Sequence, residues 1–271
     1  MNVTIQQLLE RRSIRQFTGE AVKHEDFEQI LRAGQQAPTS INGQQISLVV
    51  SHNRETIAKI AEIAGGQPQV ATADLFITLV IDFNRTALAT EAAGKHQVIE
   101  QSAEGIIVGA IDAGIMLNAL QTAANALGYG STAIGGIRNN PQAMIELLNL
   151  PEKTFPVNGL TLGVADKYQL PEIKPRVPLA SFAMCERYDS DVVRQGVCEY
   201  NKTLRQWWDK QDMAQQPSYG ESVASFYDHI YFSDIAKSFE QQGFRFRDTL
   251  PTAQKIKGAP QLDTKEYEIP E

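Results

Sequence analysis

The feature of this sequence that most constrains its fold is a long run of small and apolar residues, Gly105 to Gly128, "GIIVGAIDAGIMLNALQTAANALG". Alanine and glycine are frequent in it, and its apolar residues suit the spacing of a helix. Small side chains let a helix lie close to its neighbours. The run therefore predicts a central helix that is packed tightly against other elements.

Segments with strand and helix patterns alternate on both sides of this run. Ala73–Phe83, "ADLFITLVIDF", is too continuously apolar for a half-exposed strand, and we expect it in the middle of a sheet. Further strands are predicted at 45–53, 129–138 and 155–166, and further helices at 4–13, 23–38, 55–66 and 140–150. Such alternation predicts an α/β or an α+β architecture.

The pattern changes after the segment Lys174–Pro178. An amphipathic helix is predicted at 190–211, capped by Ser190 or Asp191, and a second one at 225–244, closed by Gly243. The residues after about Arg247 are polar and rich in Pro, Lys and Glu, which is typical of a lightly tethered tail. We therefore expect a core at 1–180, a helical excursion over it at 181–247 and a polar tail at 248–271.

Charge and composition exclude some classes of function. The chain has 271 residues, and 25 Lys and Arg stand against 32 Asp and Glu, so its formal net charge is −7. An acidic chain is a poor candidate for nonspecific nucleic-acid binding, which depends on neutralising phosphates. The amino terminus has no signal-peptide pattern, no run of about 18 apolar residues is present, and Cys185 and Cys198 are two incidental thiols. We therefore expect a cytoplasmic protein without a membrane partner.

Positive charge is nevertheless concentrated near the start, in "LLERRSIRQFTGEAV". Arg11, Arg12 and Arg15 flank Ser13 where the opening helix is expected to end, and in helical geometry Arg11 and Arg15 share a face. Guanidinium groups and a hydroxyl bind phosphate through charge-assisted hydrogen bonds. Basic residues also favour the C-terminus of a helix without any ligand. The segment is therefore either a phosphate site or an ordinary charged helix end.

Three later motifs favour a bound ligand. "APTSINGQQ", residues 37–45, gathers short hydrogen-bonding side chains that suit the edge of a heterocycle, although an ordinary loop has the same composition. "AIGGIRNN", residues 133–140, places two glycines after a strand, where a flat ligand can approach the backbone closely. "EIKPRVP", residues 172–178, adds Lys174 and Arg176 as a second basic pair.

The order RRSIR, APTSINGQQ, GGQ, AIGGIRNN and KPR resembles the FMN-dependent nitroreductase family, most closely its oxygen-insensitive NADPH nitroreductase and flavin reductase branch. The resemblance extends from about residue 3 to about residue 245. It implies an α+β fold with a central, mostly antiparallel sheet surrounded by helices and a C-terminal helical excursion that completes the cleft and the dimer. It also implies that residues 1–180 are the FMN-binding core.

The resemblance further implies a role for particular residues. Those that match the family's FMN contacts are Arg11, Arg12, Ser13, Arg15, Thr39, Ser40, Asn42, Gln67, Ile134, Gly135, Gly136, Lys174 and Arg176. In the family the two basic elements hold the phosphate, and the 39–42 loop comes from the opposite subunit of a homodimer. Ile41, Arg138 and Asn139 match positions beside the substrate or nicotinamide, although Arg138 and Asn139 could equally cap the next helix.

The chemistry that this implies needs no catalytic side chain, because FMN itself carries the hydride. Arg15 matches the cation near N1 and O2 of the flavin, where the reduced ring is anionic. We expect ping-pong turnover, in which NAD(P)H reduces the flavin and leaves before a nitroaromatic, a quinone, free flavin or a similar acceptor takes the electrons. A flavin-binding module or carrier that hands reduced FMN to a partner is the alternative.

The choice of coenzyme is left open because the chain departs from its NADPH-preferring relatives. Those relatives carry several arginines before a WSDHI-like segment, whereas residues 215–230 here, "QQPSYGESVASFYDHI", have none. Lys202 and Arg205 lie upstream and could substitute. A 2′-phosphate is poorly bound without nearby cations, so NADH is a serious alternative to NADPH.

The remaining chemistry-bearing residues indicate no second site. His24, His52, His96 and His229 are scattered, with no pair at metal-ligand spacing, and we predict no metal. Trp207 and Trp208 are interpreted as packing anchors, with subunit contact or substrate stacking as alternatives.

Overall fold

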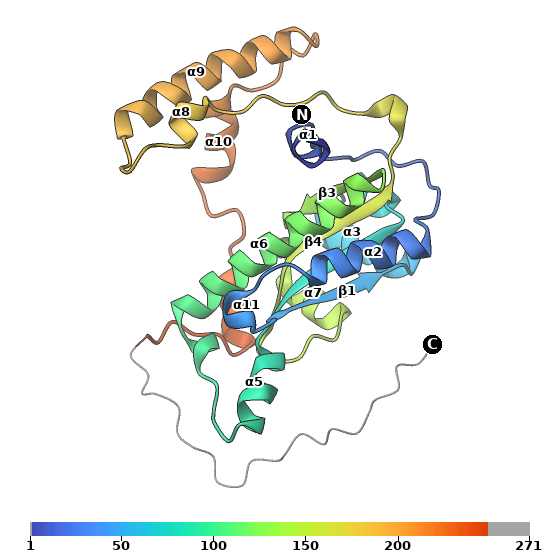
Figure 1. Ribbon diagram of the computed structural model, residues 1–271, viewed down its shortest axis with the longest axis vertical. Coiled ribbons are helices and arrows are strands. Elements are labelled where there is room, and N and C mark those ends of the chain that lie inside the picture. The colour runs from blue at the N-terminus through green and yellow to red at the C-terminus, as the bar shows by residue number, and fades with distance from the viewer. Residues whose placement is uncertain (1, 249–271) are drawn as a thin grey trace. The chain divides into compact units, whose positions relative to one another are not determined.

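The computed structural model describes residues 2–248 (Figure 1), so the predicted tail lies outside the described residues from 249 onward. Contacts divide the chain into two compact units. Unit 1 comprises Met1–Leu9, Ser13–Leu170 and Asp234–Glu271, and unit 2 comprises Glu10–Arg12 and Pro171–Ser233. The expected boundaries at 180 and 247 stay predictions, and each unit is described by itself.

Unit 1 is built on a four-stranded sheet formed by β1 (Ile46–Ser51), β2 (Leu75–Asp82), β3 (Tyr129–Ile134) and β4 (Thr154–Val164). The order is β1-β2-β4-β3 and every pairing is antiparallel, with Val49 opposite Thr78 and Thr78 opposite Gly159. β2 is therefore internal, and its two faces enter two different cores, which explains why it is apolar throughout. The expected α+β fold and the mid-sheet place of this strand are confirmed.

The predicted central helix is α6 (Ala103–Ala126), which runs beside α2 (His24–Gln35) and against the sheet (Figure 1). Small residues make this approach possible. A Cβ added at Gly109 would lie 2.7 Å from Cγ2 of Ile81, and one at Gly34 would lie 2.5 Å from Cδ2 of Leu120. By length and composition α6 could also cross a membrane, a test that the core helices of many soluble proteins pass.

The other elements of unit 1 connect and cover the sheet. The α-helices are α1 (Val3–Leu9), α3 (Arg54–Ile63), α4 (Pro68–Thr72), α5 (Phe83–Ala92), α7 (Pro141–Leu147) and α11 (Ile235–Gln241). The 3₁₀ turns are η1 (Ser40–Asn42), η2 (Ile99–Gln101), η3 (Gly135–Asn139) and η4 (Lys167–Gln169). Gly65 and Gly66 follow α3 with φ values of 85° and 72°, which confirms the predicted glycine stop.

Unit 2 contains α8 (Leu179–Phe182), α9 (Ser190–Asp209) and α10 (Tyr219–Tyr227). The predicted cap of α9 was wrong by one or two residues. Asp189 caps the helix, because its carboxylate accepts hydrogen bonds from the backbone N–H groups of Asp191 and Val192.

The prediction of one helix at 225–244 was also wrong. A capping box of Ser218 and Glu221 starts α10 earlier, and the segment between α10 and α11 is not helical. α11 belongs to unit 1, where the ring of Phe239 stacks on that of Phe155 with centroids 3.8 Å apart. Burial of this ring against the sheet decides where the second helix lies, and a local periodicity does not contain that information.

Candidate functional site

The opening basic segment is not helical. α1 ends at Leu9 and has no basic residue in its last turn, so the predicted shared helical face of Arg11 and Arg15 was wrong, as was the helix-end explanation of these arginines. Arg11 and Arg12 belong to unit 2, whereas Ser13 and Arg15 belong to unit 1. The basic segment therefore contributes to both units.

Unit 2 contains a short segment, Pro171–Arg176, that we call the basic strap. It carries the other two predicted cations, Lys174 and Arg176. Nη1 of Arg12 donates to the carbonyl oxygen of Pro171 at 3.3 Å. Nζ of Lys174 lies 5.0 Å from the ring centroid of Trp208 and 5.8 Å from that of Trp207, within the range of cation–π attraction. The structure thus brings Arg12, Lys174 and Arg176 to one segment, and the tryptophans of α9 are in contact with it.

A third contact on the strap comes from Tyr200 of α9, whose hydroxyl donates to the carbonyl oxygen of Pro175 at 3.0 Å. Burial raises the pKa of Tyr200, the charge of Arg176 opposes this and Tyr219 adds to it. A phenol is already protonated at neutral pH, and the raised pKa of Tyr200 extends this to more alkaline solution, so the hydroxyl stays a donor to the strap. Nη1 of Arg176 itself lies 3.3 Å from the carbonyl oxygens of Lys174 and Pro175.

In unit 1, Ser13 and Arg15 lie beside the edge strand β3. The backbone N–H of Ile14 donates to the carbonyl of Ser131 at 3.0 Å, and the hydroxyl of Thr132 donates to the carbonyl of Ile14 at 2.6 Å. The side chain of Arg15 is exposed. This pairing fixes the backbone of Ser13–Arg15 along β3, whose last residue, Ile134, precedes the two glycines.

The GGQ and AIGGIRNN motifs, far apart in the sequence, meet in the structure. A Cβ added at Gly136 would lie 2.5 Å from Nε2 of Gln67 and 2.7 Å from the carbonyl oxygen of Ala64. The amide of Gln67 is held at both ends, because it donates to Ala64 at 2.9 Å and accepts from Nε2 of Gln69 at 2.6 Å. A polar side chain of fixed orientation therefore packs directly on a glycine backbone.

Arg138 and Asn139 lie at the same place. Nη1 of Arg138 donates to the carbonyl oxygen of Val157, and Nδ2 of Asn139 donates to that of Ile63 at 3.3 Å. The alternative that these two residues cap the next helix is wrong, because Asn140 is the N-cap of α7 and accepts from the N–H of Ala143.

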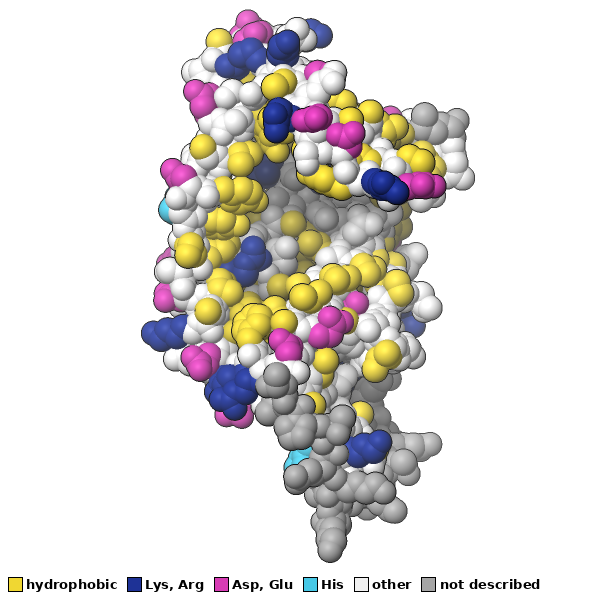
Figure 2. Space-filling view, turned by 90° about the vertical axis from the view of Figure 1, so that its left-hand side faces the viewer, with side chains coloured by type: hydrophobic (Ala, Val, Ile, Leu, Met, Phe, Trp, Pro, Cys, Tyr) yellow, Lys and Arg dark blue, Asp and Glu magenta, His cyan; other side chains and the backbone are white. Residues whose placement is uncertain are grey.

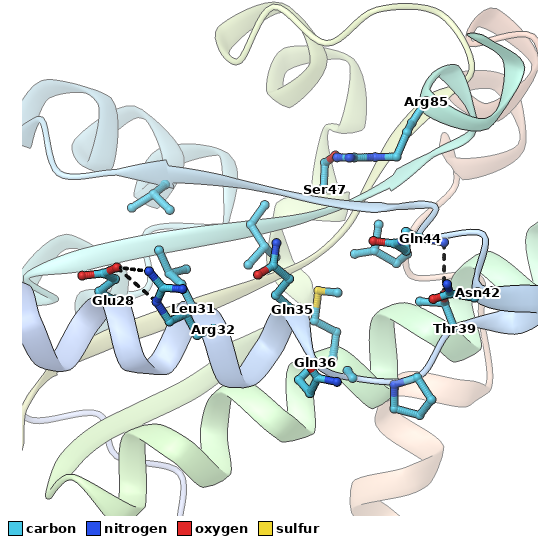
Figure 3. Close-up of a pocket in the computed structure, with 16 residues that line it drawn as sticks. Glu28, Leu31, Arg32, Gln35, Gln36, Thr39, Asn42, Gln44, Ser47 and Arg85 are labelled. Carbon is cyan, nitrogen blue, oxygen red and sulfur yellow. Dashed lines mark hydrogen bonds and ion pairs between the residues drawn. The ribbon is translucent and has the colours of Figure 1, made fainter. Parts of the chain in front are cut away.

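The loop at 39–42 has an unusual backbone. Ile41, Asn42 and Gln44 have φ values of 52°, 56° and 52°, and the side chain of Ile41 is 97% exposed. Thr39 accepts a hydrogen bond from the N–H of Gln44 (Figure 3). The loop leads into β1, whereas Ile134–Gly136 lie at the end of β3 on the opposite edge of the sheet, about 14 Å away for three strand spacings.

A groove of about 910 Å³ runs between α2 and β1 beside this loop (Figure 3). Of the predicted site residues, it is lined by Thr39 and Asn42. At one end Arg85 donates to the hydroxyl of Ser47, which donates to Asp82. We did not single out Arg85 or Ser47 from the sequence, because no local pattern marks them.

Among residues 2–248, no group of three or more His, Cys, Asp or Glu side chains could hold a metal ion. Cys185 and Cys198 are both unpaired thiols on the surface. The chemistry available at the candidate site is therefore that of cations, amides and closely approachable backbone.

Residues 8–164 match the model of the nitroreductase family, and residues 174–247 match the C-terminal domain of the same family. The chain belongs to the nitroreductase family. The resemblance inferred from the order of the motifs is thereby confirmed, together with the fold that it implied.

Relatives and solved structures agree with this assignment over most of the chain. The FMN reductase [NAD(P)H] of Bacillus subtilis is 38% identical over 249 residues, which cover 90% of this chain and 99% of the relative. The NADPH-flavin oxidoreductase of Vibrio harveyi is 34% identical and covers 77% of this chain and 83% of its own length. The structure of B. megaterium NfrA2 matches with a TM-score of 0.87 and 37% identity, covering 91% of this nitroreductase and 99% of that chain.

Proposed function

We propose that this nitroreductase binds FMN and uses it to transfer electrons from NAD(P)H to nitroaromatics, quinones, free flavin or similar acceptors. The observation that carries the proposal is the basic strap of unit 2, a segment that carries Lys174 and Arg176 and accepts a hydrogen bond from Arg12. Relatives that are named for FMN reduction with NAD(P)H support the same reaction. No side chain is required as a nucleophile, since FMN supplies the hydride chemistry when bound.

The residues present fit such a cofactor. Arg12, Lys174 and Arg176 are the donor set that a phosphate monoester prefers, and contacts from Arg12, Tyr200 and Trp208 hold the strap in place before any ligand binds. In unit 1 the amide of Gln67, held in a fixed orientation, packs on the backbone at Gly136 and places a polar side chain beside the Ile134–Gly136 segment. We assign phosphate binding to the first set, with Arg11 and Ser13, and ring binding to the second, with Ile134 and Gly135.

Two further assignments concern charge and access. Arg15 is exposed beside β3, and we assign it the stabilisation of negative charge at the N1 and O2 side of the reduced ring. Arg138 and Asn139 adjoin Gly135 and Ile63, and we assign them contact with substrate or nicotinamide.

The experiment that tests the function is anaerobic stopped-flow reduction of the FMN-loaded protein, followed by flavin absorbance. Bleaching by NADH or NADPH at a rate compatible with steady turnover, and re-oxidation by a quinone, are the expected results. Flavin that neither nucleotide bleaches would contradict the enzyme and favour the carrier.

We expect the enzyme to use NADH as coenzyme at least as readily as NADPH. Arg205, one of the two upstream candidates for a 2′-phosphate, donates to the carbonyl oxygens of Ala214 and Gln216 at 3.1 and 3.0 Å and is paired with Asp209. Its guanidinium is engaged in closing the turn after α9, and residues 215–230 contain no arginine. A charge-assisted contact to the 2′-phosphate is therefore missing from this segment.

We predict that kcat/KM for NADPH is no higher than for NADH, and that Gln215→Arg raises it for NADPH by about tenfold, the worth of one charge-assisted hydrogen bond. Parallel stopped-flow reductions measure both values. Gln215→Lys and Gln215→Met separate the contributions of charge and side-chain length. A wild-type preference for NADPH of tenfold or more would contradict this prediction.

We also propose a homodimer in which the 39–42 loop of one subunit, with Thr39, Ser40 and Asn42, reaches the flavin of the other. Two observations support it. The loop leads to β1, at the sheet edge opposite β3, which ends at Ile134 just before Gly135. Ile107, Ile111 and Ile115 form an exposed apolar row on α6, and hydrophobic side chains are gathered on the face in Figure 2 rather than scattered singly.

Replacing Ile111 with glutamate is expected to shift the protein from dimer to monomer and to release FMN in parallel, because a charge would be buried in an apolar interface. Sedimentation velocity with detection at the flavin wavelength measures both. The matched control is Leu88→Glu, an exposed apolar residue on α5. An FMN-loaded monomer would contradict the shared site.

A cytoplasmic location, in keeping with two unpaired cysteines, completes the proposal.

A further inference from the structure

A carboxylate that the proposed chemistry does not use is buried in the middle of α6. Asp112 is 3% exposed. Its Oδ2 accepts a hydrogen bond from the backbone N–H of Ser40 at 3.1 Å and another from Nε2 of Gln45. A buried carboxylate is costly unless it is hydrogen-bonded, and these two donors both come from the loop that precedes β1.

Gln45 links the carboxylate to the rest of the loop. The side chain is 3% exposed, and its backbone carbonyl accepts from the N–H of Asp82 at 2.8 Å. A Cβ added at Gly43 would lie 2.5 Å from Oε1 of Gln45, so the amide fits directly beneath that glycine. The loop is therefore tied to α6 at its first residue, Ser40, and at its last, Gln45.

Between these two ties the backbone is strained. Ile41, Asn42 and Gln44 all adopt left-handed φ values, and such values are especially unfavourable for a β-branched residue such as Ile41. Strained backbone of this kind persists only where the surroundings hold it. The result is an apolar side chain, 97% exposed, that is presented to solvent instead of being buried.

We propose that Asp112 is a positioning residue that holds the Ser40–Gln45 loop in this strained form, so that Ile41 and Asn42 are presented to flat aromatic acceptors at the flavin. The inference rests on the proposed function. Asp112 touches neither acceptor nor cofactor and acts through Ser40 and Gln45 alone. Without it, the loop relaxes and the acceptor loses a preformed surface.

The test compares FMN-loaded wild-type enzyme with Asp112→Ala, Asp112→Asn and the matched control Asp74→Ala. Asp74 accepts a hydrogen bond from the backbone N–H of Val22 at 2.7 Å, the same kind of contact elsewhere in unit 1. The probe acceptor is menadione, and the readouts are KM, kcat and backbone hydrogen exchange of residues 39–46.

Asp112→Ala is expected to raise the KM for menadione about tenfold, with faster exchange of the loop and a smaller change in kcat, because the lost hydrogen bonds act on the acceptor only through the loop. Asp112→Asn should restore KM to within about twofold, because its amide oxygen, placed where Oδ2 lies, still accepts from both the Ser40 N–H and Nε2 of Gln45. Asp74→Ala should lower Tm without moving KM.

If Asp112→Ala does not fold, Gly43→Ala tests the same link without touching the carboxylate, because its Cβ displaces the Gln45 amide, and it should raise KM with faster loop exchange. An unchanged KM in a variant whose loop exchanges faster would overturn the proposal, as would equal KM shifts in Asp112→Ala and Asp74→Ala. Wild-type flavin that neither nucleotide bleaches would overturn the proposed function instead, and loop exchange, which needs no turnover, would still report whether Asp112 holds the loop.

Discussion

Replacing Arg176 with glutamine is expected to weaken FMN binding about a hundredfold, with the apoprotein folded. Removal of one charge-assisted, paired contact to a phosphate costs about 2–3 kcal/mol, which corresponds to this factor. Glutamine keeps a polar stem of similar length, and Tyr200 still donates to Pro175, so the strap itself remains anchored. Fluorescence titration of the apoprotein with FMN measures the effect directly.

The matched control is Arg194→Gln, which removes the same charge from an exposed position on α9. We expect it to change affinity by less than about threefold, since a distant surface charge is screened by salt. The wild-type affinity should fall as salt rises, and the Arg176→Gln affinity should fall less steeply. Equal affinities for the two variants would show that the strap does not bind the phosphate.

Replacing Gly136 with alanine is expected to lower the free energy of unfolding by about 2 kcal/mol and to reduce FMN affinity as well. The new Cβ would lie 2.7 Å from the backbone oxygen of Ala64, which cannot move cheaply, and 2.5 Å from the amide of Gln67. Relief of the overlap must displace one or the other. Urea unfolding of the apoprotein and FMN titration of the folded variant separate the two effects.

Gly135→Ala serves as the control for stability. It adds the same methyl group one position earlier, where the methyl group meets a flexible side chain and not backbone. Its Cβ would lie 3.1 Å from Nη2 of Arg138, the far end of a flexible side chain. We expect a cost below about 1 kcal/mol for this variant. A Gly136→Ala protein that is destabilised but binds FMN normally would show that Gln67 does not contact the ring.

Local patterns in the sequence predicted the strands well because each pattern reports its own burial. The continuous apolar run at Ala73–Phe83 indicated a strand covered on both faces, and β2 is internal with a core on each side. Small residues in Gly105–Gly128 indicated close packing, which Gly109 provides against Ile81. The order of the motifs was sufficient to recognise the family, because each motif combines turn residues and charges in a fixed sequence.

Errors arose where a distant contact overrides a local pattern. The segment Ser225–Phe244 has continuous helical periodicity, yet it breaks because Phe239 is buried on Phe155 in unit 1 while α10 lies in unit 2. The arginines after Leu9 continue the charge pattern of a helix end, but the chain leaves the helix and Ile14 pairs with β3 instead. Pairing with a strand cannot be inferred from neighbouring residues alone.

The sequence by itself determined the family, the fold class and the residue types that a flavin phosphate and ring require. Only the tertiary structure decided which of these residues meet, that Gln67 packs on Gly136, that Tyr200 and Trp208 contact the strap, and that Asp112 ties down the loop before β1. The reason is physical. Turn chemistry and periodicity act over a few residues, whereas the cost of burying a charge or an amide is met by partners that the fold brings from far along the chain.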